Sequence, residues 1–361
     1  MRISDVYTTG AIALYQTQNP NNREPFLLQS YFPNKKKMGD DVEFLKTHRG
    51  LGIALKHSTY DALPEVRPRG QAQLTKHRMP LFRESMVIKE HDLMEIARIE
   101  DKNSPFLQPI IDSLYSDVDT LFEGAEISAE WLRAQIFAPI DGNMQINIPM
   151  VDNTISTFDY DEDKSWKNNN YLELTGSDTW DKSTSKPLND IRTATQYLAG
   201  KGYTATPMIG TSATIDYLLE NDQVKNALIS ITGQTINFVD EGTVEEVLRR
   251  KSRLEWIPYD KMFTDYTGKE RKFLPDGYVT ILGSGILGNT HRGTTPEELT
   301  TIGNFIDAPQ APVDITVLDN GIAVAIQNEY KPSFTVTTTA SQIVLPSFEG
   351  MDSIFVIKVT E

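Results

Sequence analysis

The sequence predicts an α+β protein, and three observations point to that fold class. A long stretch with helical spacing runs from Ser104 to Pro139, alternating helices and short strands cover residues 187–311, and residues 312–361 are rich in strand signals. The 361 residues are enough for two or three compact units. An apolar content of 39% is typical of a chain that folds around a core.

The first element expected along the chain is a terminal arm, residues 1–41, which shows little periodicity. Its apolar groups, Phe26–Leu28 and Tyr31–Pro33, are followed by the lysines 35–37. The favoured interpretation is a loose arm with a solvated run of charge. The alternative is that the aromatic groups dock on another subunit.

Residues 42–85 form the second element, and they are unusual for their charge. From Val42 to Lys89 there are nine Lys and Arg against four Asp and Glu, a local net charge of +5 in a chain of net −15. Short strands are expected at Val42–Phe44 and Gly52–Leu55, but bulky apolar side chains are too few to bury a core. Disorder, a nucleic-acid arm and a hairpin resting on a neighbouring copy are all possible. The basic charge on an acidic body favours the hairpin.

The stretch from Ser104 to Pro139 is the strongest helix prediction. Its apolar side chains recur at steps of three and four, from Leu107 to Ile136. Ser104 can cap the start, and Pro139 ends the helix. The polar positions, Glu126 and Arg133 among them, are expected to face solvent. A helix of this length is expected to serve as the spine of an elongated subunit, with no chemistry of its own.

The remaining elements follow from local patterns. Residues preceding the long helix, Met86–Ile99, predict only a short mixed segment, whereas Met144–Met150 alternates apolar and polar residues like a half-buried strand. Further expected elements are helices near 187–200, 212–220 and from a capping box at Thr243–Glu246, a hairpin tip at Lys269–Lys272, and strands at 206–209, 278–282, 313–318, 322–326, 334–338 and 354–359. Asn320–Gly321 suits a type I′ turn between two of these strands.

Most kinds of active site are disfavoured by composition and spacing. The chain has no cysteine, which excludes disulfides and cysteine-ligated metals, and its five histidines lack metal-ligand spacing. They are therefore expected at the surface or an interface. Asp159–Asp163 fails the EF-hand pattern, because Lys164 stands where glycine is needed, and a solvated acidic loop is expected. No serine has a nucleophile-elbow setting. The prediction is that catalytic, cofactor-binding and metal-binding residues are all absent.

One glycine motif supports the alternative of a nucleotide-binding enzyme. Gly283–Gly288 matches G-x-G-x-x-G and follows a predicted strand. A dinucleotide site needs a helix N-terminus directly after these glycines. Loop residues follow instead, and the next helix is expected to begin only at Pro296. The net charge of −15 also argues against a general nucleic-acid binder, and no stretch is long and apolar enough for a membrane span.

Several short motifs, taken in their order along the chain, resemble the lambda-type major capsid proteins of tailed bacteriophages, the capsid protein E family. The matching segments are Phe26–Leu28 with Tyr31–Pro33, Val42–Phe44 with Arg49–Gly50 and Ile53–Ala54, Pro80–Glu84, Ala138–Ile146, and Leu287–Glu298. The last segment accounts for the glycine motif. Leu45 and Leu55 depart from the family pattern, which usually has Asp and Pro there.

The resemblance implies the HK97-like capsid fold and a structural function. It implies an N-terminal arm (1–41), an extended E-loop (42–85), a peripheral domain with the spine helix (86–186), an axial α/β domain (187–311) and C-terminal strands returning to the peripheral domain (312–361). The expected product is an icosahedral shell of hexamers and pentamers around phage DNA, assembled in the bacterial cytoplasm. Scaffold, portal and decoration proteins are expected partners, and a tail or neck protein is a further alternative.

Overall fold

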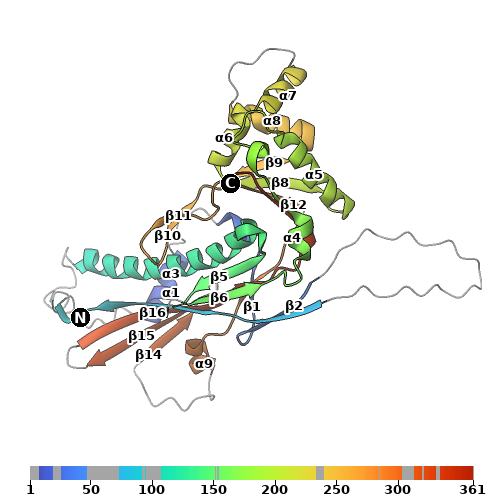
Figure 1. Cartoon of the computed structure of the whole chain (residues 1–361). Helices are drawn as coiled ribbons and strands as arrows, with labels where there is room; N and C mark the ends of the chain where they lie inside the picture. The colour runs from blue at the N-terminus through green and yellow to red at the C-terminus, as the bar shows by residue number, and fades with distance from the viewer. Residues whose placement is uncertain are drawn as a thin grey trace, which may run out of the picture. The chain divides into compact units, whose positions relative to one another are not determined.

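The computed structural model describes residues 8–18, 26–46, 73–91, 94, 107–150, 152, 154–232, 240–283, 285–302, 313–318, 321–330 and 334–360. The described chain mixes helices and sheets (Figure 1) and divides into two compact units. Unit 1 comprises residues 1–42, 76–130 and 289–347, and unit 2 comprises residues 43–75, 131–288 and 348–361. Residues 86–186 and 187–311 are each divided between the two units.

The long helix is found where the sequence predicts it. Helix α3 (Leu107–Phe137) has 31 residues and ends two residues before Pro139. The boundary between the units falls inside it, between Glu130 and Trp131. Its last turn lies in unit 2, where the hydroxyl of Thr280 donates to the carbonyl of Phe137 at 2.6 Å. This bond satisfies one of the carbonyls that a helix C-terminus leaves without an intrahelical partner.

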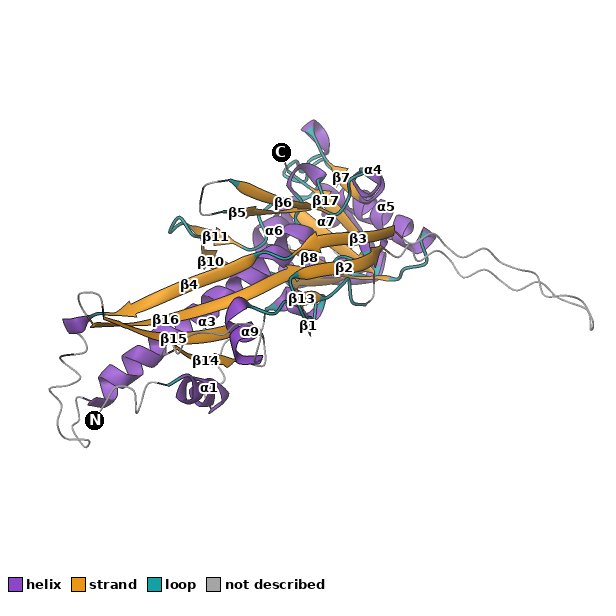
Figure 2. Ribbon diagram, turned by 90° about the horizontal axis from the view of Figure 1, so that it is seen from below, coloured by secondary structure: helices purple, strands orange, loops and turns teal. Residues whose placement is uncertain are grey.

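Unit 1 is a mixed sheet with helices packed on it. The strand order is β1-β13-β16-β15-β14, and β4 pairs with the other edge of β16 (Figure 2). The elements are α1 (Thr9–Gln18), β1 (Asn34–Lys36), β4 (Leu81–Ile88), β13 (Thr290–Arg292), α9 (Pro296–Ile302), β14 (Val313–Val317), β15 (Ala323–Tyr330) and β16 (Phe334–Pro346). Buried side chains of α3, Val118, Leu121 and Phe122 among them, pack against Val324 and Val336 of the sheet. Strands β2 (Asp41–Lys46) and β3 (Gln73–Arg78) pair with each other, and the residues of each strand are divided between the two units.

Unit 2 is a five-stranded sheet covered by helices. Its order is β7-β17-β12-β8-β9, and helix α5 packs on β12, β17 and β8. The elements are β5 (Gln145–Pro149), β6 (Ile155–Asp159), α4 (Ser165–Asn170), β7 (Tyr171–Glu173), α5 (Pro187–Gly200), β8 (Ala205–Gly210), α6 (Ser212–Glu220), α7 (Asp222–Thr232), α8 (Glu241–Ser252), β9 (Glu255–Pro258), β10 (Met262–Thr264), β11 (Glu270–Lys272), β12 (Tyr278–Gly283) and β17 (Ile354–Lys358). Its core contains Trp180, Leu198, Met208, Leu248 and Ile281.

Three local predictions are wrong in ways the structure explains. Residues 81–88 form strand β4, although Met86–Ile99 was expected to be a mixed segment, because β4 pairs with a strand some 250 residues later. Helix α8 starts earlier than the capping box at Thr243–Glu246 implies. The side chain of Asp240 is its cap and accepts the backbone N–H of Thr243 at 2.9 Å.

The third correction concerns the turn between β14 and β15. The hairpin is found as predicted, but its turn is longer than the two-residue type I′ turn. The amide of Leu318 donates to the carbonyl of Ile322 at 3.0 Å, so these two residues are paired, and a two-residue turn at Asn320–Gly321 does not fit between them. Residues 319 and 320 lie outside the described residues, and Gly321 has a φ of +80°. A glycine with positive φ at this position is typical of a three-residue hairpin turn.

Candidate assembly surface

The described part of the N-terminal segment is packed on unit 1. Leu28 and Phe32 are fully buried, and the backbone N–H of Leu28 donates to the carboxylate of Glu130 on α3 at 3.0 Å. Strand β1 then runs parallel to β13. Both interpretations of this segment, a loose arm or docking on another subunit, are therefore wrong for residues 26–40. This segment is part of its own subunit's fold.

A buried ion pair joins α3 to the sheet of unit 1. Arg292 on β13 is 1% exposed, and its guanidinium contacts both carboxylate oxygens of Glu126 at 2.9 Å. It also donates to the side chain of Gln342 on β16, whose amide donates to the carbonyl of Ala125 at 2.6 Å. The prediction that Glu126 and Arg133 face solvent is wrong. Arg133 is fully buried, and Glu126 is half-buried, with its side chain 20% exposed and paired with Arg292. Helical spacing alone does not reveal a helix that is covered on several sides.

In the glycine motif, Gly283 ends β12 and residues 285–288 follow it in unit 2, while Ser284 lies outside the described residues. The backbone N–H groups of Glu349 and Gly350 donate to the carbonyl of the buried Leu287, at 3.1 and 2.7 Å. Gly283 packs so closely that an added Cβ would lie 2.9 Å from the Cβ of Tyr203. The next helix, α9, begins at Pro296, as predicted. Gly283 therefore allows close packing against Tyr203, and the residues after the motif do not present a helix N-terminus.

The acidic stretch Asp159–Asp163 is only partly solvated, contrary to the prediction. Asp161 is 1% exposed and accepts the backbone N–H groups of Trp166 and Lys167, both at 2.9 Å. Its carboxylate thereby satisfies the first amides of helix α4. Asp163 is exposed, and hydrogen bonds from Ser165 lower the pKa of its carboxyl group. The carboxylate at 161 serves to start a helix.

The base of the basic segment is fixed by ion pairs. Lys76 lies 2.9 Å from Asp41, and Arg78 donates to Asp40 at 2.6 Å, which lowers the pKa of the Asp40 carboxyl group. The backbone N–H of Met79 donates to the carbonyl of Asp40 at 2.7 Å. Residues 47–72, with the predicted strand Gly52–Leu55, lie outside the described residues. The paired strands β2 and β3 hold the two ends of this segment together.

The histidines divide between surface and interior. His91 is exposed, as expected, whereas His291 on β13 is 6% exposed, so the prediction of a surface or interface position is wrong for His291. His48 and His57 lie outside the described residues. Within the described ranges, no three His, Asp or Glu side chains are placed to hold a metal ion. None of the helices described is long and apolar enough to cross a membrane.

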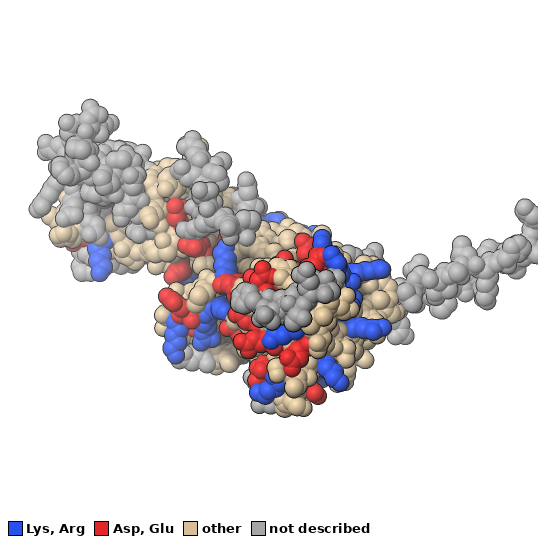
Figure 3. Space-filling model, turned by 90° about the horizontal axis from the view of Figure 1, so that it is seen from above, with Lys and Arg blue, Asp and Glu red and all other residues tan. Residues whose placement is uncertain are grey.

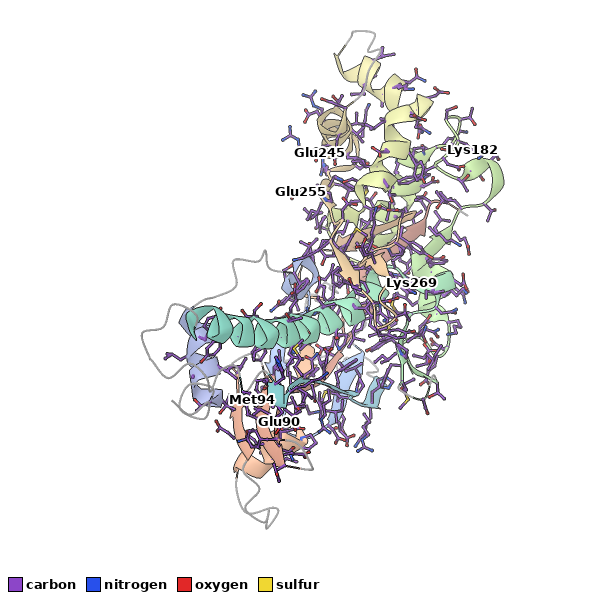
Figure 4. All side chains as sticks on the ribbon, turned by 90° about the vertical axis from the view of Figure 1, so that its left-hand side faces the viewer. Glu90, Met94, Lys182, Glu245, Glu255 and Lys269 are labelled. Atoms are coloured by element: carbon purple, nitrogen blue, oxygen red, sulfur yellow. The ribbon has the colours of Figure 1, made fainter. Side chains whose placement is uncertain are left out.

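The outer surface of unit 2 carries charges of both signs. On the face of helices α5–α8 seen in Figure 3, Asp and Glu side chains gather in the middle, with Lys and Arg side chains around them. Figure 4 labels four exposed examples from this unit: Lys182, Glu245, Glu255 and Lys269. In unit 1, Glu90 and Met94, which follow β4, are also exposed. Such a mixed surface suits contact between like subunits better than a uniformly charged one would.

The fold resembles solved structures of phage proteins. A prophage protein of Escherichia coli CFT073, assigned as a capsid protein, matches with a TM-score of 0.61 and 12% identity, over 98% of this chain and 99% of that chain. A phage-related protein from Bordetella bronchiseptica RB50 matches with a TM-score of 0.54 and 9% identity, over 97% and 96% of the two chains. No curated protein matches the sequence. The fold is thus that of the HK97-like capsid proteins.

The family assignment rests on the sequence as well as the fold. Residues 8–332 match the family model described as phage major capsid protein E. Proteins of this family and fold are structural, so the alternatives of a nucleotide-binding enzyme and of a tail or neck protein are set aside. Because the match covers well over half of the sequence, the chain belongs to the phage major capsid protein E family.

Proposed function

We propose that copies of this chain assemble into hexamers and pentamers and so form an icosahedral shell around packaged phage DNA. The observation that carries the proposal is the match to the major capsid protein family over residues 8–332. Members of that family form the shell of the virion. The mixed charge of unit 2 supports contacts between like subunits, because opposite charges can then meet across an interface.

Within this shell, the parts of the chain take different roles. Residues 1–41 are the N-terminal arm, 42–85 the extended loop, 86–186 the peripheral domain with α3 as its spine, and 187–311 the axial domain, with 312–361 returning to the peripheral domain. The packing of residues 26–40 on α3 and β13 favours an arm whose described end is fixed to its own subunit. The length of α3, 31 residues, supports its role as a spine.

The segment 47–72 docks on a neighbouring copy in this proposal. The excess of basic residues between Val42 and Lys89 favours attraction to an acidic sibling chain of net charge −15. The ion pairs at the base, Lys76–Asp41 and Arg78–Asp40, keep β2 and β3 together. The segment would then contribute interface area without having to fold a core of its own.

Other partners follow from the same role. Packaged DNA is held inside without sequence-specific contacts, and a scaffold protein, a portal and decoration proteins complete the particle, which is assembled in the host cytoplasm. An acidic protein binds DNA weakly because it repels the phosphate backbone, and this favours DNA that slides during packaging.

Electron microscopy of the purified protein tests the proposal. We expect closed shells in negative stain, and tubes, rings or dispersed subunits under all assembly conditions would contradict it. A variant in which residues 48–71 are replaced by a short Gly-Ser turn keeps β2 and β3, and we expect it to remain folded and to form no shells. A matched replacement of residues 233–239 should leave assembly intact. Normal shells from the first variant would refute the docking role of the segment.

A further inference from the structure

Strand β4 of unit 1 has an open edge in the described structure. Its register with β16 is unbroken from Leu81–Ile343 to Ile88–Val336, and the described strands provide no partner on its other side (Figure 2). Five of its eight residues are exposed, among them Leu81 at 43% and Val87 at 51%. Natural proteins usually protect such edges with charged side chains, Pro or a bulge. Residues 81–88 contain no proline and form no bulge, and their two charged side chains are Glu84 and Arg83, which is paired with Glu297 of the same chain.

The hydrogen-bond pattern shows which backbone groups face the open edge. The N–H of Val344 donates to the carbonyl of Pro80 at 3.3 Å, so residues 80 and 344 are a hydrogen-bonded pair. Such pairs alternate along an antiparallel ladder. The even-numbered residues of β4 therefore bond to β16. The N–H and C=O groups of the odd-numbered residues point away from it, and these residues are Leu81, Arg83, Ser85 and Val87.

The sequence of β4 is self-complementary about its centre. Positions equally far from Glu84 on its two sides are Arg83 and Ser85, Phe82 and Met86, and Leu81 and Val87. An antiparallel strand of the same sequence, centred on Glu84, would place apolar side chains opposite each other on both faces of the sheet. Centring on Ser85 would set Arg83 against Val87. Centring on Arg83 would set Phe82 against Glu84 and Leu81 against Ser85, so it would keep one like-charged pair and lose both apolar pairs.

We infer that β4 pairs antiparallel with β4 of a second copy, about a two-fold axis at Glu84. This inference rests on the proposed assembly and names one of its contacts. The four residues whose N–H and C=O groups face the open edge then form hydrogen-bonded pairs across the axis: Leu81 of each copy pairs with Val87 of the other, and Arg83 of each copy pairs with Ser85 of the other. The contact is isologous, because the same strand serves on both sides. The two Glu84 side chains lie opposite each other, and this like-charged pair weakens the contact that the apolar pairs stabilise.

A cysteine at the axis tests the register directly. The chain has no cysteine, so any disulfide must come from the introduced residue. In Glu84→Cys the two Cα atoms would lie about 4.5 Å apart, within the range of disulfides. We expect most of this full-length variant to form a disulfide dimer under mild oxidation. Ser85→Cys is the matched control and should give little dimer, because its two Cα atoms would be more than about 7 Å apart.

A proline variant distinguishes disulfide dimers that need strand pairing from those formed by chance collision of two chains. Ser85→Pro removes an N–H that faces the open edge. It leaves the backbone bonds from β4 to β16 in place and loses only the 2.8 Å side-chain bond between Ser85 and Thr339, which Ser85→Cys also loses. We expect Glu84→Cys/Ser85→Pro to lose most of the dimer while its circular dichroism spectrum stays unchanged. In wild type, hydrogen exchange at Arg83, Ser85 and Val87 should slow on assembly, whereas exchange at Glu84 and Met86 should change little.

The outcomes separate this inference from the proposed function. Shells that form normally while Glu84→Cys gives no dimer, and while exchange at Ser85 stays fast, would overturn the β4 pairing and leave the shell-forming role standing. A dimer from Ser85→Cys in place of Glu84→Cys would also overturn it, since it would show another register. The pairing would be supported, even if shells were absent, if Glu84→Cys gave a dimer that neither Ser85→Cys nor Glu84→Cys/Ser85→Pro gave.

Discussion

Replacing Arg292 by alanine should destabilise unit 1 strongly. The guanidinium is 1% exposed and contacts Glu126 through two 2.9 Å bonds, and its removal leaves a carboxylate that is 20% exposed without this partner. Breaking a buried ion pair from one side costs about 3–5 kcal/mol, and the residual exposure of Glu126 favours the lower end, about 3 kcal/mol. For a unit of roughly 150 residues this corresponds to a drop in Tm of about 6–12 °C.

Thermal unfolding of the soluble subunit followed by circular dichroism measures this effect. Arg83→Ala is the matched control, because Arg83 is 46% exposed and Glu297, which is 15% exposed, keeps the 2.8 Å hydrogen bond from Ser341 when the arginine is removed. The loss should therefore be smaller. Hydrogen exchange should locate the loss in α3 and β13. If Arg292→Ala lowers the Tm no more than Arg83→Ala does, the argument that this pair anchors α3 to the sheet is wrong.

Three further predictions concern single residues. Asp161→Ala should destabilise unit 2 by about 1–2 kcal/mol, since two backbone amides lose their acceptor, and Asp163→Ala should cost less; tryptophan fluorescence during thermal unfolding compares them, and equal effects would contradict the capping role. Gly142→Ala should lower the stability of unit 2 by about 1–3 kcal/mol more than Gly176→Ala does. Both glycines have positive φ, but only at Gly142 would the new Cβ lie 2.5 Å from the ring of Tyr171. Denaturant midpoints measure the difference, and equal midpoints would refute the clash. The pKa of Asp40 is lowered, so its pairing with Arg78 stabilises the hairpin base fully above the unfolded pKa near 3.8, and this stabilisation is lost as the pH falls through the lower folded pKa. Hydrogen exchange at Met79 should therefore accelerate below the folded pKa in wild type and lose this pH dependence in Asp40→Asn. An unchanged pH profile in the variant would exclude Asp40 as the titrating group.

Elements whose signal is local could be predicted from the sequence. Helix α3 follows from apolar spacing and a terminating proline, and helices α5 and α6 and strands β8, β12 and β17 lie close to their predicted ranges. The hairpin of β14 and β15 also follows from its pattern. Its turn length does not, because the position of Gly321 in the turn depends on the register of the two strands.

Elements whose stability comes from distant partners could not be predicted. Strand β4 has no clean alternation, and its pairing with β16 is what makes it a strand. Arg133 and Glu126 look solvent-facing in a helical pattern, yet a partner such as Arg292 comes from a strand 166 residues away. Asp161 resembles its acidic neighbours in sequence, and only the position of α4 distinguishes it. Family resemblance supplied the assembly role, for which no single residue carries a chemical signature.

The way the chain alternates between the two units has a consequence for its synthesis. The polypeptide passes from one unit to the other five times, so unit 1 is built from segments far apart in the chain. Strand β16, the centre of the unit 1 sheet, is synthesised after β4, β13 and β15, which all pair with it. A prematurely terminated product would lack the strand on which β4, β13 and β15 all depend. Unit 1 could not form its sheet in such a fragment, and in the proposed assembly the fragment would not enter a growing particle.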